Sequence, residues 1–144
     1  MRTVRVERTI AAPRERVFEV LSDHANYDRF RGIREAILLR KGEPPPNGLG
    51  ALRRVLIGPL KFEEEITLYE EPARFDYLIV QINVPFDHQG GTIRLSEADG
   101  GTRAEWTSTF RIRSLLAPIL ERCWSFGLGR GFKRVLKDVE RILS

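Results

Sequence analysis

The chain has 144 residues, 42% hydrophobic and 31% charged, which fits one soluble globular domain spanning 1–144. No apolar run approaches the roughly 18 to 20 residues that span a bilayer, and the opening Met-Arg-Thr-Val-Arg-Val-Glu lacks an apolar signal core. A single cysteine, Cys123, excludes an intrachain disulfide. We therefore expect a cytoplasmic protein in a reducing compartment.

The net charge of +4 is unevenly distributed. Residues 111–144 contain eight Lys or Arg and three Asp or Glu, a net charge of +5, whereas the rest of the chain is close to neutral. Cations near the C-terminus of a helix interact favourably with its dipole, so a solvated helix face explains this excess. A patch for an acidic membrane surface or RNA is the alternative.

The N-terminal third predicts one strand and two short helices. A strand over 3–11 is indicated by alternation that gives one face to Val4, Val6, Arg8 and Ile10. Pro13 suits the first turn of a helix over 13–22, because its missing N–H has no partner there anyway. Tyr27 and Phe30 lie three residues apart, as in a second short helix, and Gly32 closes it.

Six further strands are predicted between turn sequences. Residues 42–48 contain three consecutive prolines, which cannot donate to a sheet ladder, so this segment is an exposed connection. Asp99-Gly100-Gly101 indicates a tight hairpin. The predicted strands cover 33–41, 51–57, 60–69, 74–83, 87–97 and 102–113.

A long helix is predicted over 115–143. Pro118 fits only near its first turn, so the starting residue stays open. Gly127, Gly129 and Gly131 weaken its middle, each by up to about 1 kcal/mol relative to alanine. Such glycines allow either a ligand or the short helices to approach closely. The apolar stripe consists of Leu116, Ile119, Leu120, Cys123, Phe126, Phe132, Val135, Val139 and Ile142.

Several local motifs resemble the START-like (SRPBCC) superfamily, in particular its polyketide cyclase/dehydrase and lipid-transport branch. They are Ile10-Ala-Ala-Pro13 with Val17-Phe18, Leu21-Ser22-Asp23, Tyr27, Gly50-Ala-Leu-Arg53, Glu65-Ile66, Glu71-Pro-Ala-Arg-Phe-Asp-Tyr77, and Gly100-Gly-Thr102 with Trp106 and Phe110. The resemblance extends over essentially the whole chain. It implies an α+β helix-grip fold, in which a seven-stranded curved antiparallel sheet surrounds a long C-terminal helix, with two short helices after the first strand.

Members of that superfamily bind sterols, lipids, quinones, polyketides or hormones, and some are enzymes whereas others are carriers. Fold alone does not choose among these functions. A sheet bent around one helix has more concave face than the helix fills, so we expect an internal cavity. The residues expected to line it are Phe62, Glu64, Ile66, Ile93, Leu95, Trp106, Ser108 and Phe110 from the strands, and Leu120, Cys123, Trp124, Gly127 and Phe132 from the helix.

Four residues are candidates for acid–base chemistry in such a cavity: Glu64, Arg8, Tyr77 and His88. A carboxylate in an apolar pocket has its charged form disfavoured, which is how proteins prepare a general acid or base. The alternative for Glu64 is a structural ion pair with Arg53 or Arg54 on the preceding strand.

Other chemistries are not indicated. Neither His24 nor His88 has a Cys, His or carboxylate at a spacing typical of metal ligands, so we expect no metal and no cofactor. Ser108 lacks a Gly-x-Ser-x-Gly elbow. Cys123 falls on the apolar stripe, where a buried inert cysteine is expected.

Three functions follow as hypotheses. The first is binding or transport of a small hydrophobic ligand such as a lipid, quinone or polyketide. The second is a cyclase, aromatase or dehydratase acting in the same cavity. The third is an interaction module in which the basic C-terminal helix meets a membrane surface, RNA or a protein. The sequence lacks the aromatic–basic interleaving of a nucleic-acid binder, which argues against RNA. The sequence leaves monomer and homodimer open.

Overall fold

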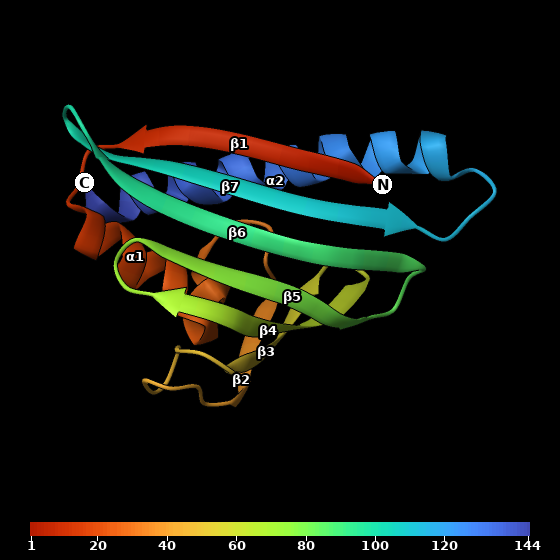
Figure 1. The fold of residues 1–144 in the computed structure, drawn as a ribbon, viewed down its shortest axis with the longest axis horizontal. Coiled ribbons are helices and arrows are strands. Elements are labelled where there is room, and N and C mark those ends of the chain that lie inside the picture. Colours follow the sequence, from red (N-terminus) through yellow and green to blue (C-terminus); the bar gives the residue numbers. More distant parts are fainter.

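The computed structural model describes residues 1–144 as one curved sheet with helices on its concave side (Figure 1). The elements, in chain order, are β1 (Arg2–Ile10), α1 (Arg14–Ser22), the 3-10 helix η1 (His24–Arg29), β2 (Glu35–Arg40), β3 (Leu52–Ile57), β4 (Leu60–Glu70), β5 (Arg74–Ile82), β6 (Phe86–Ala98), β7 (Gly101–Ile112) and α2 (Ala117–Leu143). The predicted element order and the helix-grip architecture are confirmed.

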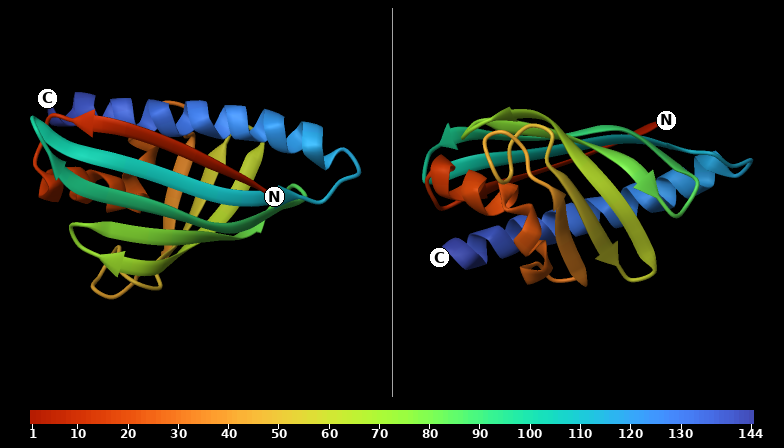
Figure 2. Two further views of the ribbon diagram at one scale, coloured as in Figure 1. Left: turned by 45° about the horizontal axis from the view of Figure 1, so that its top comes forward. Right: turned by 90° about the horizontal axis from the view of Figure 1, so that it is seen from below.

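All seven strands pair antiparallel in the order β1-β7-β6-β5-β4-β3-β2. The chain therefore forms a meander from β2 to β7, and β1 joins the far edge beside β7. Figure 2 shows β2, β3 and β4 curving away from the plane of β1 and β7, with α2 running along the β1 and β7 side. The helix consequently leaves part of the concave face uncovered.

Element boundaries differ from the sequence prediction by a few residues at the helices. The long helix begins at Ala117, not at 115, because Pro118 can stand only in a first turn. Ser114 accepts a hydrogen bond from the Leu116 amide (3.1 Å) in the turn before it. The second short helix is a 3-10 helix interrupted at Asn26, whose backbone is not helical. None of the helices combines the length and apolar character of a membrane-spanning helix.

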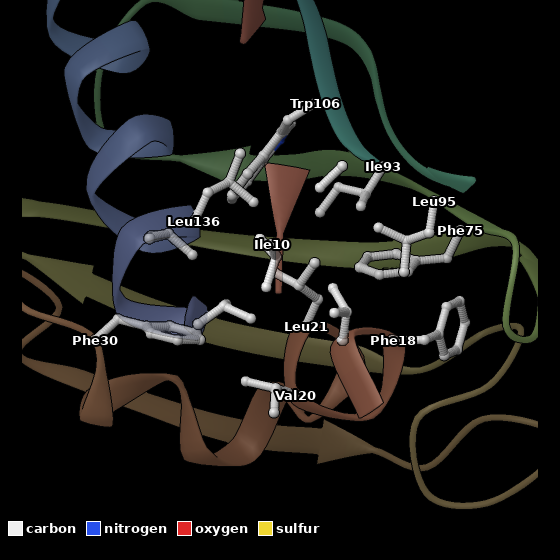
Figure 3. Packing of buried hydrophobic residues seen from close by; sticks show 14 of the residues in the cluster. Ile10, Phe18, Val20, Leu21, Phe30, Phe75, Ile93, Leu95, Trp106 and Leu136 are labelled. Carbon is white, nitrogen blue, oxygen red and sulfur yellow. The ribbon is translucent and has the colours of Figure 1, made fainter. Parts of the chain in front are cut away.

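The main core fills the space between the sheet, α1 and the C-terminal half of α2. Figure 3 shows it converging around Ile10, Phe18, Leu21, Phe30, Phe75, Ile93, Leu95 and Leu136. A smaller cluster of Val4, Phe86, Phe110 and Ile112 packs under the first half of α2, against Leu120 and Trp124. The two clusters close the ends of the concave face and leave its centre open.

Candidate ligand-binding cavity

A cavity of about 450 Å³ lies between the concave face of the sheet and α2. It is lined by 24 residues, of which 15 are hydrophobic, and its size lies within the range of small-molecule sites. The lining residues are Tyr27, Arg31, Gly32, Ile33, Arg53, Val55, Ile57, Leu60, Phe62, Glu64, Tyr77, Ile79, Ile82, Phe86, Trp106, Ser108, Trp124, Gly127, Leu128, Arg130, Gly131, Phe132, Arg134 and Val135.

Most residues expected from alternation point to the concave face, but only some of them reach the cavity. Those in its wall are Phe62, Glu64, Trp106, Ser108, Trp124, Gly127 and Phe132. Trp106 and Phe132 stack with ring centroids 4.1 Å apart, which joins the sheet wall to the helix wall. The cavity wall therefore contains residues expected from the strands and residues expected from the long helix.

The remaining expected lining residues lie in three other places. Ile66, Ile93 and Leu95 belong to the main core, because α1 covers their end of the sheet. Phe110 and Leu120 pack in the smaller cluster below the first half of α2. The expectation of a buried Cys123 is wrong: its side chain is exposed, since the inward face of α2 passes through Leu120 and Trp124 instead.

One end of the cavity holds a buried ion pair. Arg53 and Glu64 are 4% and 6% exposed, and the Arg53 Nε donates to Glu64 Oε2 at 2.6 Å. The guanidinium also lies 4.2 Å from the Tyr27 ring centroid and bonds His24 Nδ1 at 2.6 Å. Burial, and then the Arg53 charge, hold the pKa of His24 well below its usual range, so His24 is neutral and accepts this bond.

A second polar cluster spans β5, β6 and β7. Trp106 Nε1 donates to the Tyr77 hydroxyl oxygen at 2.8 Å, and His88 Nε2 lies 2.9 Å from Ser108 Oγ. The Ile79 amide donates to His88 Nδ1 at 2.9 Å. Burial lowers the pKa of His88 to about 4 and raises the pKa of Tyr77, so both are neutral at pH 7.

The four candidate acid–base residues thus have different positions. Glu64 and Tyr77 line the cavity, whereas His88 lies behind the lining, where it contacts Ser108 and the Tyr77 ring. Arg8 does not line the cavity. It bonds Glu140 of α2 at 2.6 Å and is partly exposed, because its long side chain reaches the edge of the helix.

The solvent-exposed mouth of the cavity contains three arginines and one glycine, Gly32, that the sequence prediction missed, beside Gly131, which it had named. Arg31, Arg130 and Arg134 line it, together with Gly32 and Gly131. Arg130 and Arg134 form no ion pair, and a Cβ atom at Gly127 or Gly131 would meet nothing within 4 Å. Close packing of the short helices therefore does not account for these two glycines. Their spacing with Arg130 and Arg134 on one helix face was the available signal.

Comparison with known proteins agrees with this architecture. Residues 1–143 match the family model described as polyketide cyclase / dehydrase and lipid transport. The chain belongs to this family. No match to the chain was found among curated proteins.

Solved structures share the fold of this family member at low sequence identity. Protein TTHA0849 from Thermus thermophilus is 20% identical with a TM-score of 0.80, over 97% of this chain and 95% of that one. A START superfamily protein from Mycobacterium smegmatis is 14% identical with a TM-score of 0.79, over 98% and 96%. The Zhui aromatase/cyclase from Streptomyces sp. R1128 is 22% identical with a TM-score of 0.78, over 99% and 96%.

Proposed function

We propose that the protein binds a small hydrophobic molecule in this cavity and acts as its carrier. The observation that carries the proposal is a cavity of about 450 Å³ whose lining is mostly hydrophobic. The single carboxylate in its wall, Glu64, is already paired with Arg53. A site of this kind supplies burial and orientation, and it leaves little free acid–base capacity.

Native mass spectrometry of the purified protein, followed by organic extraction, tests the proposal. Two variants on β5 form a matched pair: Ile79 lines the cavity, whereas the adjacent Val80 is 49% exposed on the opposite face. We expect Ile79→Trp to fill the cavity and lose the ligand, and Val80→Trp to keep it. If Ile79→Trp retained the same ligand load, the proposal would be wrong.

An empty purified protein calls for a titration instead. Trp106 and Trp124 line the cavity, so their fluorescence reports occupancy by added hydrophobic probes. Saturable binding that Ile79→Trp abolishes supports the proposal. The absence of saturable binding across lipid, quinone and polycyclic probes contradicts it.

A cyclase- or dehydratase-type reaction in the same cavity is a second candidate. It is favoured by Tyr77 and Glu64, two ionisable groups that share the cavity wall on neighbouring strands. Such a reaction would be established if the wild-type protein converted the extracted molecule into a product and the variants Tyr77→Phe and Glu64→Gln did not. Recovery of the molecule unchanged would favour the carrier.

Contact with an anionic membrane surface is a third candidate, and the outer face of α2 favours it. Arg122, Lys133 and Lys137 are exposed there and form no ion pair. The exposed apolar residues Leu115, Leu116, Ile119 and Phe126 lie toward the N-terminal end of the same helix. Binding to phosphatidylserine vesicles, measured by co-sedimentation, should weaken as the salt concentration rises. It should also be weaker in the variant Lys133→Gln/Lys137→Gln. Arg16→Gln on α1 is the control. Binding to RNA alone would argue for a different partner.

A further inference from the structure

The hydrogen bonds around Tyr77 and Ser108 have a fixed direction. A backbone amide can only donate, so the bond from Ile79 requires His88 Nδ1 to be an unprotonated acceptor. The hydrogen of the neutral imidazole is then on Nε2, and this nitrogen donates to Ser108 Oγ at 2.9 Å. An indole N–H likewise can only donate, so Trp106 donates to the Tyr77 hydroxyl oxygen at 2.8 Å.

Both hydroxyl oxygens therefore accept a hydrogen bond while their own hydrogens still need acceptors. Tyr77 and Ser108 are each 3% exposed, and both line the cavity. Even where one hydroxyl donates to the other, one hydrogen of the pair is left over, whichever way that bond runs. The protein offers no side-chain acceptor for it: Glu64, the one carboxylate in the wall, bonds Arg53 and makes no hydrogen bond to either hydroxyl.

The surplus donor is held rigidly. The Tyr77 ring lies directly over Gly91 on the neighbouring strand, where a Cβ atom would come within 2.2 Å of the ring. His88 stacks on the ring at a centroid distance of 5.3 Å and an interplanar angle of 17°. Because these contacts fix the ring before any ligand arrives, the hydroxyl needs little ordering on binding.

We propose that the Tyr77–Ser108 hydroxyl pair is a recognition site for a carbonyl oxygen, and that the ligand is a largely apolar ketone or quinone. This inference rests on the proposed binding function and names its ligand class. A carbonyl oxygen accepts the surplus hydrogen, which a hydrocarbon would leave unpaired in an apolar cavity. A neutral carbonyl suits the position better than a carboxylate, since Glu64 lies on the same face and the nearest buried cation, Arg53, is already paired with it.

Fluorenone and fluorene, which share a shape and differ at the carbonyl, test the inference. We expect the wild-type protein to bind fluorenone about tenfold more tightly than fluorene. In Tyr77→Phe/Ser108→Ala this preference should disappear, with fluorene affinity retained. Tyr69→Phe/Ser96→Ala removes the same two groups outside the cavity and should keep the preference. The infrared carbonyl band of bound fluorenone should move to lower wavenumber in the wild type and return in the double variant.

The outcomes separate the two proposals. Equal binding of both probes by the wild type, or a preference that survives in the double variant, overturns the carbonyl site and leaves the carrier function standing. Failure of both probes and of the wider probe set overturns the carrier function and this inference with it. If the double variant does not fold, the infrared shift in the wild type and the single variants Tyr77→Phe and Ser108→Ala still decide the question.

Discussion

Arg53 organises the polar end of the cavity. The residue is 4% exposed. Its guanidinium forms hydrogen bonds with Glu64 and His24 and lies over the ring of Tyr27. A buried pair of this kind is costly to break, because removal of one partner leaves the other charge buried and uncompensated. A reaction that used Glu64 as a general base would have to break this pair.

Arg53→Met should therefore lower the free energy of unfolding by about 3 kcal/mol or more, and Arg53→Met/Glu64→Met should recover most of that loss. Arg54 and Glu63 provide the control, since they form a partly exposed pair at 3.4 Å on the opposite face of the same strands. Arg54→Met should cost less than about 1 kcal/mol. Urea denaturation of the four proteins measures this, and a double variant no more stable than Arg53→Met would contradict it.

His88 makes stability depend on pH. Its pKa is lowered by burial from 6.5 to about 4, so the unfolded chain binds the proton more readily than the native protein. The contribution of neutral His88 to the free energy of unfolding is therefore full above pH 6.5 and decreases as the pH falls toward 4. Between pH 7 and pH 5 the decrease amounts to about 2 kcal/mol.

His88→Gln carries no titratable proton, so its unfolding free energy should fall by about 2 kcal/mol less over the same interval. Urea denaturation at both pH values makes the comparison. Identical pH dependence of the two proteins would show that His88 is not buried in its neutral form.

At the scale of elements, α2 combines a packed half with an open one. Val135, Leu136 and Val139 are buried in the main core, whereas Gly127 and Gly131 leave empty space at the cavity mouth. Glycine lowers helix stability, and no neighbouring atom requires it at these two positions. We infer that the missing side chains keep the mouth wide.

Gly127→Ala and Gly131→Ala should each raise the free energy of unfolding by up to about 1 kcal/mol. Gly127→Leu/Gly131→Leu should slow ligand entry, because two larger side chains would then occupy the mouth. Lys133→Leu, on the outward side of α2, is the control. Stopped-flow quenching of tryptophan fluorescence measures entry, and an unchanged rate in the leucine double variant would place the entrance elsewhere.

At the scale of the whole molecule, Asp138 links the long helix to the loop after η1. It is fully buried and accepts hydrogen bonds from the Arg31 amide at 2.9 Å and Arg31 Nε at 2.8 Å. Because Arg31 also lines the cavity, this link ties α2 to the segment after η1 beside the cavity.

Asp138→Ala should lower the free energy of unfolding by about 2 kcal/mol, since two charge-assisted bonds are lost and the Arg31 amide loses its partner. Glu140→Ala, which breaks the half-exposed pair with Arg8, should cost about 1 kcal/mol or less. Thermal and urea unfolding compare them. Equal effects of the two variants would contradict the structural role given to Asp138.

The sequence by itself determined the elements, their order and the face that most strand residues present. These features follow from local periodicity, turn chemistry and proline, all of which act within a few residues of the chain. It also indicated an ion pair of Glu64 with Arg53 or Arg54, because consecutive glutamates on a strand must turn at least one side chain inward. The structure selects Arg53.

Only the tertiary structure decided which inward residues meet the cavity. Ile66 and Phe62 lie on the same face of β4, yet the first packs in the main core, whereas the second lines the cavity. His88 on β6 meets Ser108 on the neighbouring strand β7, twenty residues later in the chain, beside a bulge between His88 and Gly90 that alternation does not reveal. Sheet curvature and long-range register set these contacts, and both depend on how separate elements pack together and not on the sequence within any one of them.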